Sequence, residues 1–107
     1  MIALIAENRK EIAELCEQYG VRRLSVFGSA AKGTFDPVTS DLDFVVDYFD
    51  WGPGIFHRLF GFIVALEDLL GRRVDMTTEP IKDPYFREEV ERTKDVIYEA
   101  SRRETAA

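Results

Sequence analysis

Two stretches of the chain decide its fold: Phe27-Gly28-Ser29-Ala30-Ala31-Lys32-Gly33 and, with eleven residues between Ser29 and Asp41, Asp41-Leu42-Asp43-Phe44. The first stretch ends a short apolar run and then turns, because glycine adopts backbone conformations that other residues avoid. The second alternates carboxylates with apolar side chains. Because such alternation is typical of a half-buried strand, we predict two strands separated by one helical turn, Ser29–Lys32, and a turn-rich loop.

The strand Asp41–Val46 carries the first candidate site. Its alternation places one set of apolar side chains on the same face: Leu42, Phe44 and Val46. Asp41 and Asp43 share the other face with Cα atoms roughly 6.6 Å apart, so their side chains can converge on one cation. Mg²⁺ prefers oxygen ligands and commonly binds one or two carboxylates together with substrate phosphates. On this pair alone, an exposed sheet edge with solubilising charge is an equally good interpretation.

The Gly28-Ser29 turn adds a candidate phosphate site. Glycine lets the backbone approach a ligand closely, and N–H groups at the start of a helix favour phosphate. The Ser29 hydroxyl can donate a further hydrogen bond, and Lys32 can supply positive charge. The stretch is not a P-loop, because it lacks the Gly-Lys-Ser/Thr ending.

Asp75 is the third candidate carboxylate. It lies between Val74 and Met76 in the expected strand Arg72–Thr78, where an aspartate is unfavourable unless it faces water or a ligand. If that strand lies beside the Asp41 strand, three carboxylates share one face. Such an arrangement is typical of two-metal phosphoryl-transfer sites.

The remaining elements define the fold class. We expect helices over about residues 3–18, over Ile55–Leu70, and from near Pro84 with Asp83 as its N-cap, and a strand over Arg22–Phe27. The last helix is expected to continue far enough for Val96 and Ile97 to supply its apolar side. The predicted fold is α/β (α+β), a small mixed three-stranded sheet covered by helices, in a single domain over residues 1–107.

Composition restricts the function. The 107 residues carry a formal net charge of −6, so general nucleic-acid binding is not expected. A single cysteine, Cys16, excludes an intrachain disulfide and fits a reducing compartment. No stretch approaches the ~20 apolar residues of a membrane span. We therefore expect a soluble, cytoplasmic protein.

Together, Phe27-Gly28-Ser29 and Asp41-Leu42-Asp43-Phe44 resemble the signature of the DNA polymerase beta nucleotidyltransferase superfamily. Gly28–Gly33 and Ser40–Asp43 are most similar to its minimal nucleotidyltransferases (MNT), and Asp83–Glu88 and Ile97–Glu99 resemble the last helix of that group. The resemblance implies a nucleotidyltransferase fold, ATP as substrate and two Mg²⁺ ions.

The resemblance also assigns roles. It implies that Gly28 and Ser29 hold the triphosphate, that Asp41 and Asp43 bind both metals, and that Asp75 binds the catalytic metal and helps to deprotonate the acceptor hydroxyl. Such domains are often antitoxins paired with a small helical RNase toxin of the HEPN class, and some silence it by transferring AMP to a tyrosine. Two alternatives stay open: a noncatalytic antitoxin that acts by binding alone, and a nucleotidyltransferase of small molecules.

Other residues are assigned structural roles. We expect Asp47 and the pair Arg22-Arg23 to be solvated, and His57 to lie on a helix surface or in helix packing. The apolar stripe of the Ile55–Leu70 helix is wider than one core face needs. Either the helix is buried on several sides, or its outer side, with Trp51 and Phe62, meets a partner or a second copy.

Overall fold

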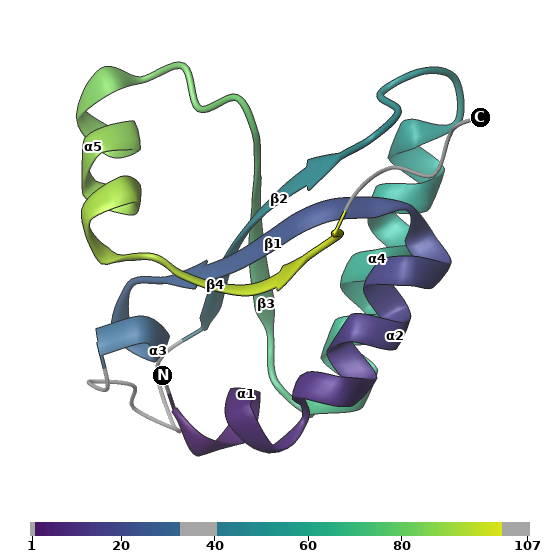
Figure 1. Cartoon of the computed structure of the whole chain (residues 1–107), viewed down its shortest axis with the longest axis horizontal. Helices are drawn as coiled ribbons and strands as arrows, with labels where there is room; N and C mark the ends of the chain where they lie inside the picture. The colour runs from purple at the N-terminus through teal and green to yellow at the C-terminus, as the bar shows by residue number, and fades with distance from the viewer. Residues whose placement is uncertain (1, 33–40, 102–107) are drawn as a thin grey trace.

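A four-stranded sheet with helices on both faces forms the computed structural model, which describes residues 2–32 and 41–101 (Figure 1). The strands are β1 Val21–Phe27, β2 Leu42–Tyr48, β3 Val74–Thr78 and β4 Asp95–Glu99, in the spatial order β3-β2-β1-β4. β1 pairs antiparallel with β2 and β4, whereas β2 pairs parallel with β3. The mixed sheet is as predicted, but the predicted count of three strands was wrong by one.

The extra strand, β4, replaces the end of the predicted last helix. α5 covers Pro84–Thr93, and Lys94 closes it by donating its N–H to the Val90 carbonyl at 2.8 Å. The next residues, Asp95–Glu99, pair with the outer edge of β1. Val96 and Ile97 are β-branched and suit a pleated surface better than a helix. The apolar side expected of the helix therefore belongs to an edge strand.

The helices otherwise follow the prediction, with one interruption. They are α1 Ala3–Glu7, α2 Arg9–Tyr19, α3 Ser29–Lys32, α4 Ile55–Leu70 and α5. The expected helix over residues 3–18 is broken at Asn8, whose side-chain amide donates to the Leu4 carbonyl at 2.9 Å. Asparagine competes in this way for helix carbonyls, which explains the break. None of the helices in the described ranges is long and apolar enough to cross a lipid bilayer.

The larger core lies on the sheet face that α2 and α4 cover, with the two helices side by side (Figure 1). The sheet contributes alternate buried side chains to it: Leu24, Val26, Leu42, Phe44 and Val46. Phe62, Leu66 and Leu70 of α4 join this core, so Phe62 is fully buried and the prediction that it faces a partner was wrong. The alternation predicted for Asp41–Val46 is confirmed by this packing.

α5 covers part of the opposite face (Figure 1). A smaller apolar cluster joins Phe27 and Val45 of the sheet to Ile81 and to Val90 of α5. Asp43 and Val45 alternate onto this same face, so the cluster adjoins the candidate carboxylates. The predicted turn-rich loop, residues 33–40, lies outside the described residues.

The N-cap of α5 provides a test of the fold. Asp83 accepts hydrogen bonds from the backbone N–H groups of Tyr85 at 2.9 Å and Phe86 at 3.4 Å, as predicted. Asp83→Ala should lower the free energy of unfolding by about 1 kcal/mol, measured by chemical denaturation, because two helix N–H groups lose their acceptor. Asp83→Asn keeps an acceptor and should lose less. Equal losses in the two variants would contradict the capping role.

Candidate functional site

The parallel pairing of β2 with β3 brings two candidate carboxylates together. Asp43 is the register partner of Asp75, on neighbouring strands that run about 4.8 Å apart. Because register partners in a sheet point to the same face, both side chains lie on the α5 side. The condition set for Asp75, that its strand lies beside the Asp41 strand, is met.

Electrostatic repulsion is concentrated at Asp43. The pKa of its carboxyl is raised above the ordinary aspartate value, first by burial and then by the charges of Asp75 and Asp41. Two like charges and partial removal from water therefore both disfavour an ionised Asp43. A cation bound between these carboxylates would reverse both effects.

Asp41 lies just before β2 and is more exposed. The Leu42 N–H donates to the Arg73 carbonyl at 3.0 Å, which fixes the chain here beside the start of β3. Asp41 Oδ1 lies 3.9 Å from Arg73 Nε, and both side chains are at least half exposed, so this ion pair is weak. Asp41 is near enough to influence Asp43 but is turned toward the arginine.

The oxygen donors of the three aspartates suit a hard cation, although the three side chains do not converge on one point. Within residues 2–32 and 41–101, no three Asp, Glu, His or Cys side chains are close enough to hold a metal ion as they stand. Asp43 and Asp75 nevertheless offer only oxygen donors on one face, with repulsion that a divalent cation relieves. A rotation of the exposed Asp41 side chain away from Arg73 would supply a third ligand.

Gly28 places backbone close to the Asp43 carboxylate. Its φ of +68° lies in the left-handed region, and a Cβ added there would lie 2.7 Å from Asp43 Oδ2. Phe27, one residue earlier, is the β1 register partner of Asp43. Glycine is therefore required here both for the turn and for the close approach to Asp43.

The turn after Gly28 is the predicted single helical turn. α3 covers Ser29–Lys32, and the Ala31 N–H donates to the Gly28 carbonyl at 3.2 Å. Ser29 is half-buried at the start of this turn, directly after Gly28. The position of the Lys32 side chain lies outside the described part of the chain, so its predicted phosphate contact stays a prediction.

α5 packs against the same end of β1. Phe27 and Phe86 meet edge to face with ring centroids 5.7 Å apart. Tyr85, the preceding residue, is 83% exposed. Sequence reasoning found α5 through its N-cap but did not find that it stands on the carboxylate face, because that placement depends on tertiary packing.

Two residue groups that were expected to be solvated are instead paired. Arg22 Nε donates to Asp47 Oδ2 at 2.8 Å, and Trp51 Nε1 donates to Asp47 Oδ1 at 3.3 Å. Arg23 lies 3.4 Å from a carboxylate oxygen of Glu79, and its side chain is about one quarter exposed. These pairs lie at the end of β1 that is far from Gly28. They therefore connect β1 to neighbouring parts of the fold and do not contribute to the candidate site.

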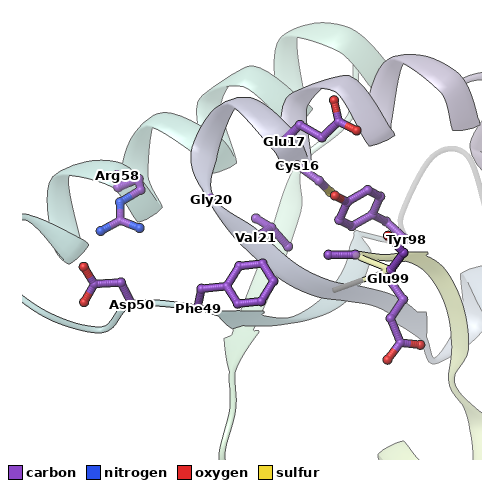
Figure 2. A pocket seen from close by; sticks show the side chains of 11 residues that line it. Cys16, Glu17, Gly20, Val21, Phe49, Asp50, Arg58, Tyr98 and Glu99 are labelled. Atoms are coloured by element: carbon purple, nitrogen blue, oxygen red, sulfur yellow. The ribbon is translucent and has the colours of Figure 1, made fainter. Parts of the chain in front are cut away.

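A depression of about 800 Å³ also lies away from the carboxylates (Figure 2). It is lined where α2 ends and β1 begins, with Arg58, Asp50 and Tyr98 around it. Arg58 stacks 5.5 Å from the centre of the Tyr48 ring, and the Cys16 thiol is buried beside it with a raised pKa, mainly because of burial. None of the predicted site residues lines this depression.

Comparison with known proteins gives a consistent result. Residues 9–100 match the model of a family described as "Nucleotidyltransferase domain". A relative from Methanocaldococcus jannaschii, "Putative protein adenylyltransferase MJ0126", is 36% identical over 91 residues, which are 84% of this chain and 88% of the relative.

Two solved structures share the fold. "Structure of putative minimal nucleotidyltransferase" is 33% identical, with a TM-score of 0.73 and coverage of 88% of this chain and 95% of that one. A chain in a complex of a tri-AMPylated Shewanella oneidensis HEPN toxin with an MNT antitoxin is 16% identical, with a TM-score of 0.63 and coverage of 89% and 72%. At that identity the second likeness concerns the fold alone.

The contact between Gly28 and Asp43 makes a quantitative prediction. Gly28→Ala and Gly71→Ala both place a Cβ at nearly the same positive φ, +68° and +66°, but only the first meets another atom within 4 Å. Each should lower the free energy of unfolding by about 1–2 kcal/mol through backbone strain. Gly28→Ala should lose more, because its methyl group displaces the Asp43 carboxylate.

A double-mutant cycle isolates that contact. Asp43→Ala should recover the additional loss in the Gly28→Ala background and leave the Gly71→Ala loss unchanged, measured by chemical denaturation. Additive effects in both backgrounds would show that Gly28 does not touch Asp43 in solution.

Proposed function

The chain belongs to the nucleotidyltransferase domain family, and from this membership we propose that it transfers AMP from ATP to a partner protein. One observation carries the proposal: Asp43 and Asp75 lie side by side on the sheet face against which the Gly28 backbone is pressed. That arrangement combines divalent-metal ligands with a backbone turn suited to phosphate, which are the two needs of a nucleotide triphosphate.

Asp43 and Asp75 are the proposed metal ligands at the centre of the site, with Asp41 as the third. When bound there, two Mg²⁺ ions would neutralise triphosphate charge and lower the pKa of the attacking hydroxyl. Asp41 and Asp43, two residues apart, would face both ions, whereas Asp75 would face only the ion on the acceptor side. The raised pKa of Asp43 supports this assignment, because burial and then the neighbouring charges of Asp75 and Asp41 disfavour its ionised form, which a bound cation would favour.

Gly28 and Ser29 are the proposed triphosphate contacts. The left-handed Gly28 turn allows a phosphate oxygen to approach the backbone at the start of α3. The Ser29 hydroxyl is a further donor. Lys32 would add positive charge at the end of the same turn.

The reaction we propose is an in-line displacement at the α-phosphorus. The acceptor hydroxyl oxygen forms a bond to the α-phosphorus, and the bond from that phosphorus to the bridging oxygen of pyrophosphate breaks. The hydroxyl proton passes to the Asp75 carboxylate, which lies on the exposed side of the pair. The products are the AMP-modified acceptor and pyrophosphate.

A protein acceptor fits the accessibility of the site. Asp41 and Asp75 are exposed, so a large molecule can reach the carboxylates directly. The name of the M. jannaschii relative and the complex of an MNT antitoxin with an AMPylated HEPN toxin support a protein acceptor, and a small helical HEPN toxin in particular. A binding-only antitoxin and a small-molecule nucleotidyltransferase are the competing functions.

Substitution of the aspartates by asparagine tests the proposal. Mg-ATP at a hundredfold its Kd should raise the free energy of unfolding of the wild type by about 2.7 kcal/mol, and a chelator should remove the effect. Asp43→Asn should lose this stabilisation. Asp75→Asn should keep more of it and chiefly lose transfer, by about 100-fold or more, because the metal charge it holds acts on the transition state.

The assay measures label transfer from α-labelled ATP to the candidate toxin, beside denaturation of each variant. Asp50→Asn is the matched control, because Asp50 is an exposed aspartate near the other end of β2, where its side chain accepts a hydrogen bond from the Gly52 N–H. Wild-type transfer by Asp43→Asn would rule out the metal site. Lost transfer with undiminished toxin neutralisation would favour a binding-only antitoxin, and labelling of small alcohols but of no protein would favour the small-molecule enzyme.

A further inference from the structure

The outer side of α4 carries an apolar stripe that the core does not use. Phe56, Phe60 and Val64 are 73%, 65% and 54% exposed and follow one another at four-residue spacing. Residues at this spacing lie on one face of a helix. Single exposed apolar residues are ordinary, but a contiguous stripe with two aromatic rings is typical of a contact surface.

A shallow hollow of about 400 Å³ adjoins the stripe. The small residues Gly61 and Ala65 line it, together with Tyr19 of α2. Tyr19 already packs over Gly61, since a Cβ added to Gly61 would lie 3.0 Å from its ring. The surface therefore presents the exposed Phe60 beside a hollow that Tyr19 and Gly61 both line.

Polar side chains mark the two ends of this surface. His57 and Asp68 both line the hollow and are exposed. Within the described residues neither side chain has an ion-pair or hydrogen-bond partner. With Gly61 and Val64 they form what we call the α4 seam, the series His57, Gly61, Val64 and Asp68. Its spacing of four, three and four residues is that of a coiled-coil contact line.

We propose that the α4 seam binds a second copy of this chain, with the two α4 helices antiparallel. In that orientation one register satisfies every member of the seam. It places His57 opposite Asp68 of the partner copy, and Gly61 opposite Val64 of the partner copy, because both pairs share the same midpoint along the helix. Phe60 then lies beside Val64 of the partner copy at the edge of the seam.

A second copy is favoured over another partner because the seam is complementary to itself. A two-fold axis makes each contact occur twice, so a suitable surface must carry both members of every pair. The α4 seam carries a histidine and a carboxylate at opposite ends, and a missing side chain and a valine at matched positions nearer the centre. The interface is small, so we expect an affinity in the micromolar range and not an obligate dimer.

The dimer leaves the candidate site free. α4 packs against the sheet face opposite to that of α5 (Figure 1). Asp43 and Asp75 lie on the α5 side, so a dimer through α4 would leave both sites uncovered. The inference stands on the α4 seam alone and does not rest on the proposed transfer activity.

Sedimentation velocity over a range of concentrations tests the association. The wild type should shift from monomer toward dimer as its concentration rises. Phe60→Lys and Val64→Lys should each remain monomeric, because every substitution places two charges in the seam. Tyr85→Lys is the matched control, since Tyr85 is 83% exposed on α5 and should leave the dimer unchanged. A wild type that stays monomeric at several hundred micromolar, or lysine variants that still dimerise, would overturn the inference.

Cysteine crosslinking tests the register. His57→Cys and Asp68→Cys should form a disulfide when the two single variants are mixed under oxidation, whereas neither should crosslink to itself. The two positions are eleven apart in the sequence, so like cysteines in an antiparallel pair would lie about 16 Å apart along the axis, beyond disulfide reach. The native Cys16 is buried and will not compete. Self-crosslinked His57→Cys without a mixed product would overturn the antiparallel register.

Discussion

The parallel pairing of β2 with β3 is the constraint on which the candidate site depends. It sets Asp43 beside Asp75, although thirty-one residues separate them in the chain. Parallel neighbours require a crossover connection, and α4 supplies it while burying Phe62 and Leu66 against the sheet. The long apolar helix is therefore what allows two carboxylates from separate strands to meet.

The two faces of the sheet have different roles. One face carries the large apolar core beneath α2 and α4, and the other carries the carboxylates beside the smaller cluster under α5. The unfavourable feature of the carboxylate face is the ionisation of Asp43, because burial and two neighbouring carboxylates raise its pKa. The large core can tolerate that local cost, and a divalent cation with a triphosphate would relieve it.

Local patterns predicted the features that depend on one strand or one cap. The period of two placed Asp43 opposite the buried Leu42 and Phe44, and the Asp83-Pro84 pair marked the start of α5. The family resemblance, carried by Gly28-Ser29 and the two aspartates, predicted the family. The prediction that Asp75 lies beside Asp43 depended on the strand order, which the hydrophobic periodicity of a sequence does not determine.

The misses share a physical origin in tertiary pairing. Val96 and Ile97 fit a helix stripe as well as a strand, and only the free edge of β1 selects the strand. Asp47 appeared solvated because its partner, Arg22, lies on another strand, beside a register irregularity. The excess apolar width of α4 was recognised, but the rotation of the helix about its axis, which buries Phe62 and exposes Phe60, depends on packing.

The central claim is that Asp43 and Asp75 hold divalent metal and nucleotide against the Gly28 turn. The most direct test is anomalous diffraction from crystals grown with Mn²⁺ and a nonhydrolysable ATP analogue. The account predicts an anomalous peak within coordination distance of both carboxylates, with the triphosphate next to Gly28 and Ser29. Metal or triphosphate bound elsewhere, such as in the depression beside Arg58 and Asp50, with Asp43 free of both, would contradict it.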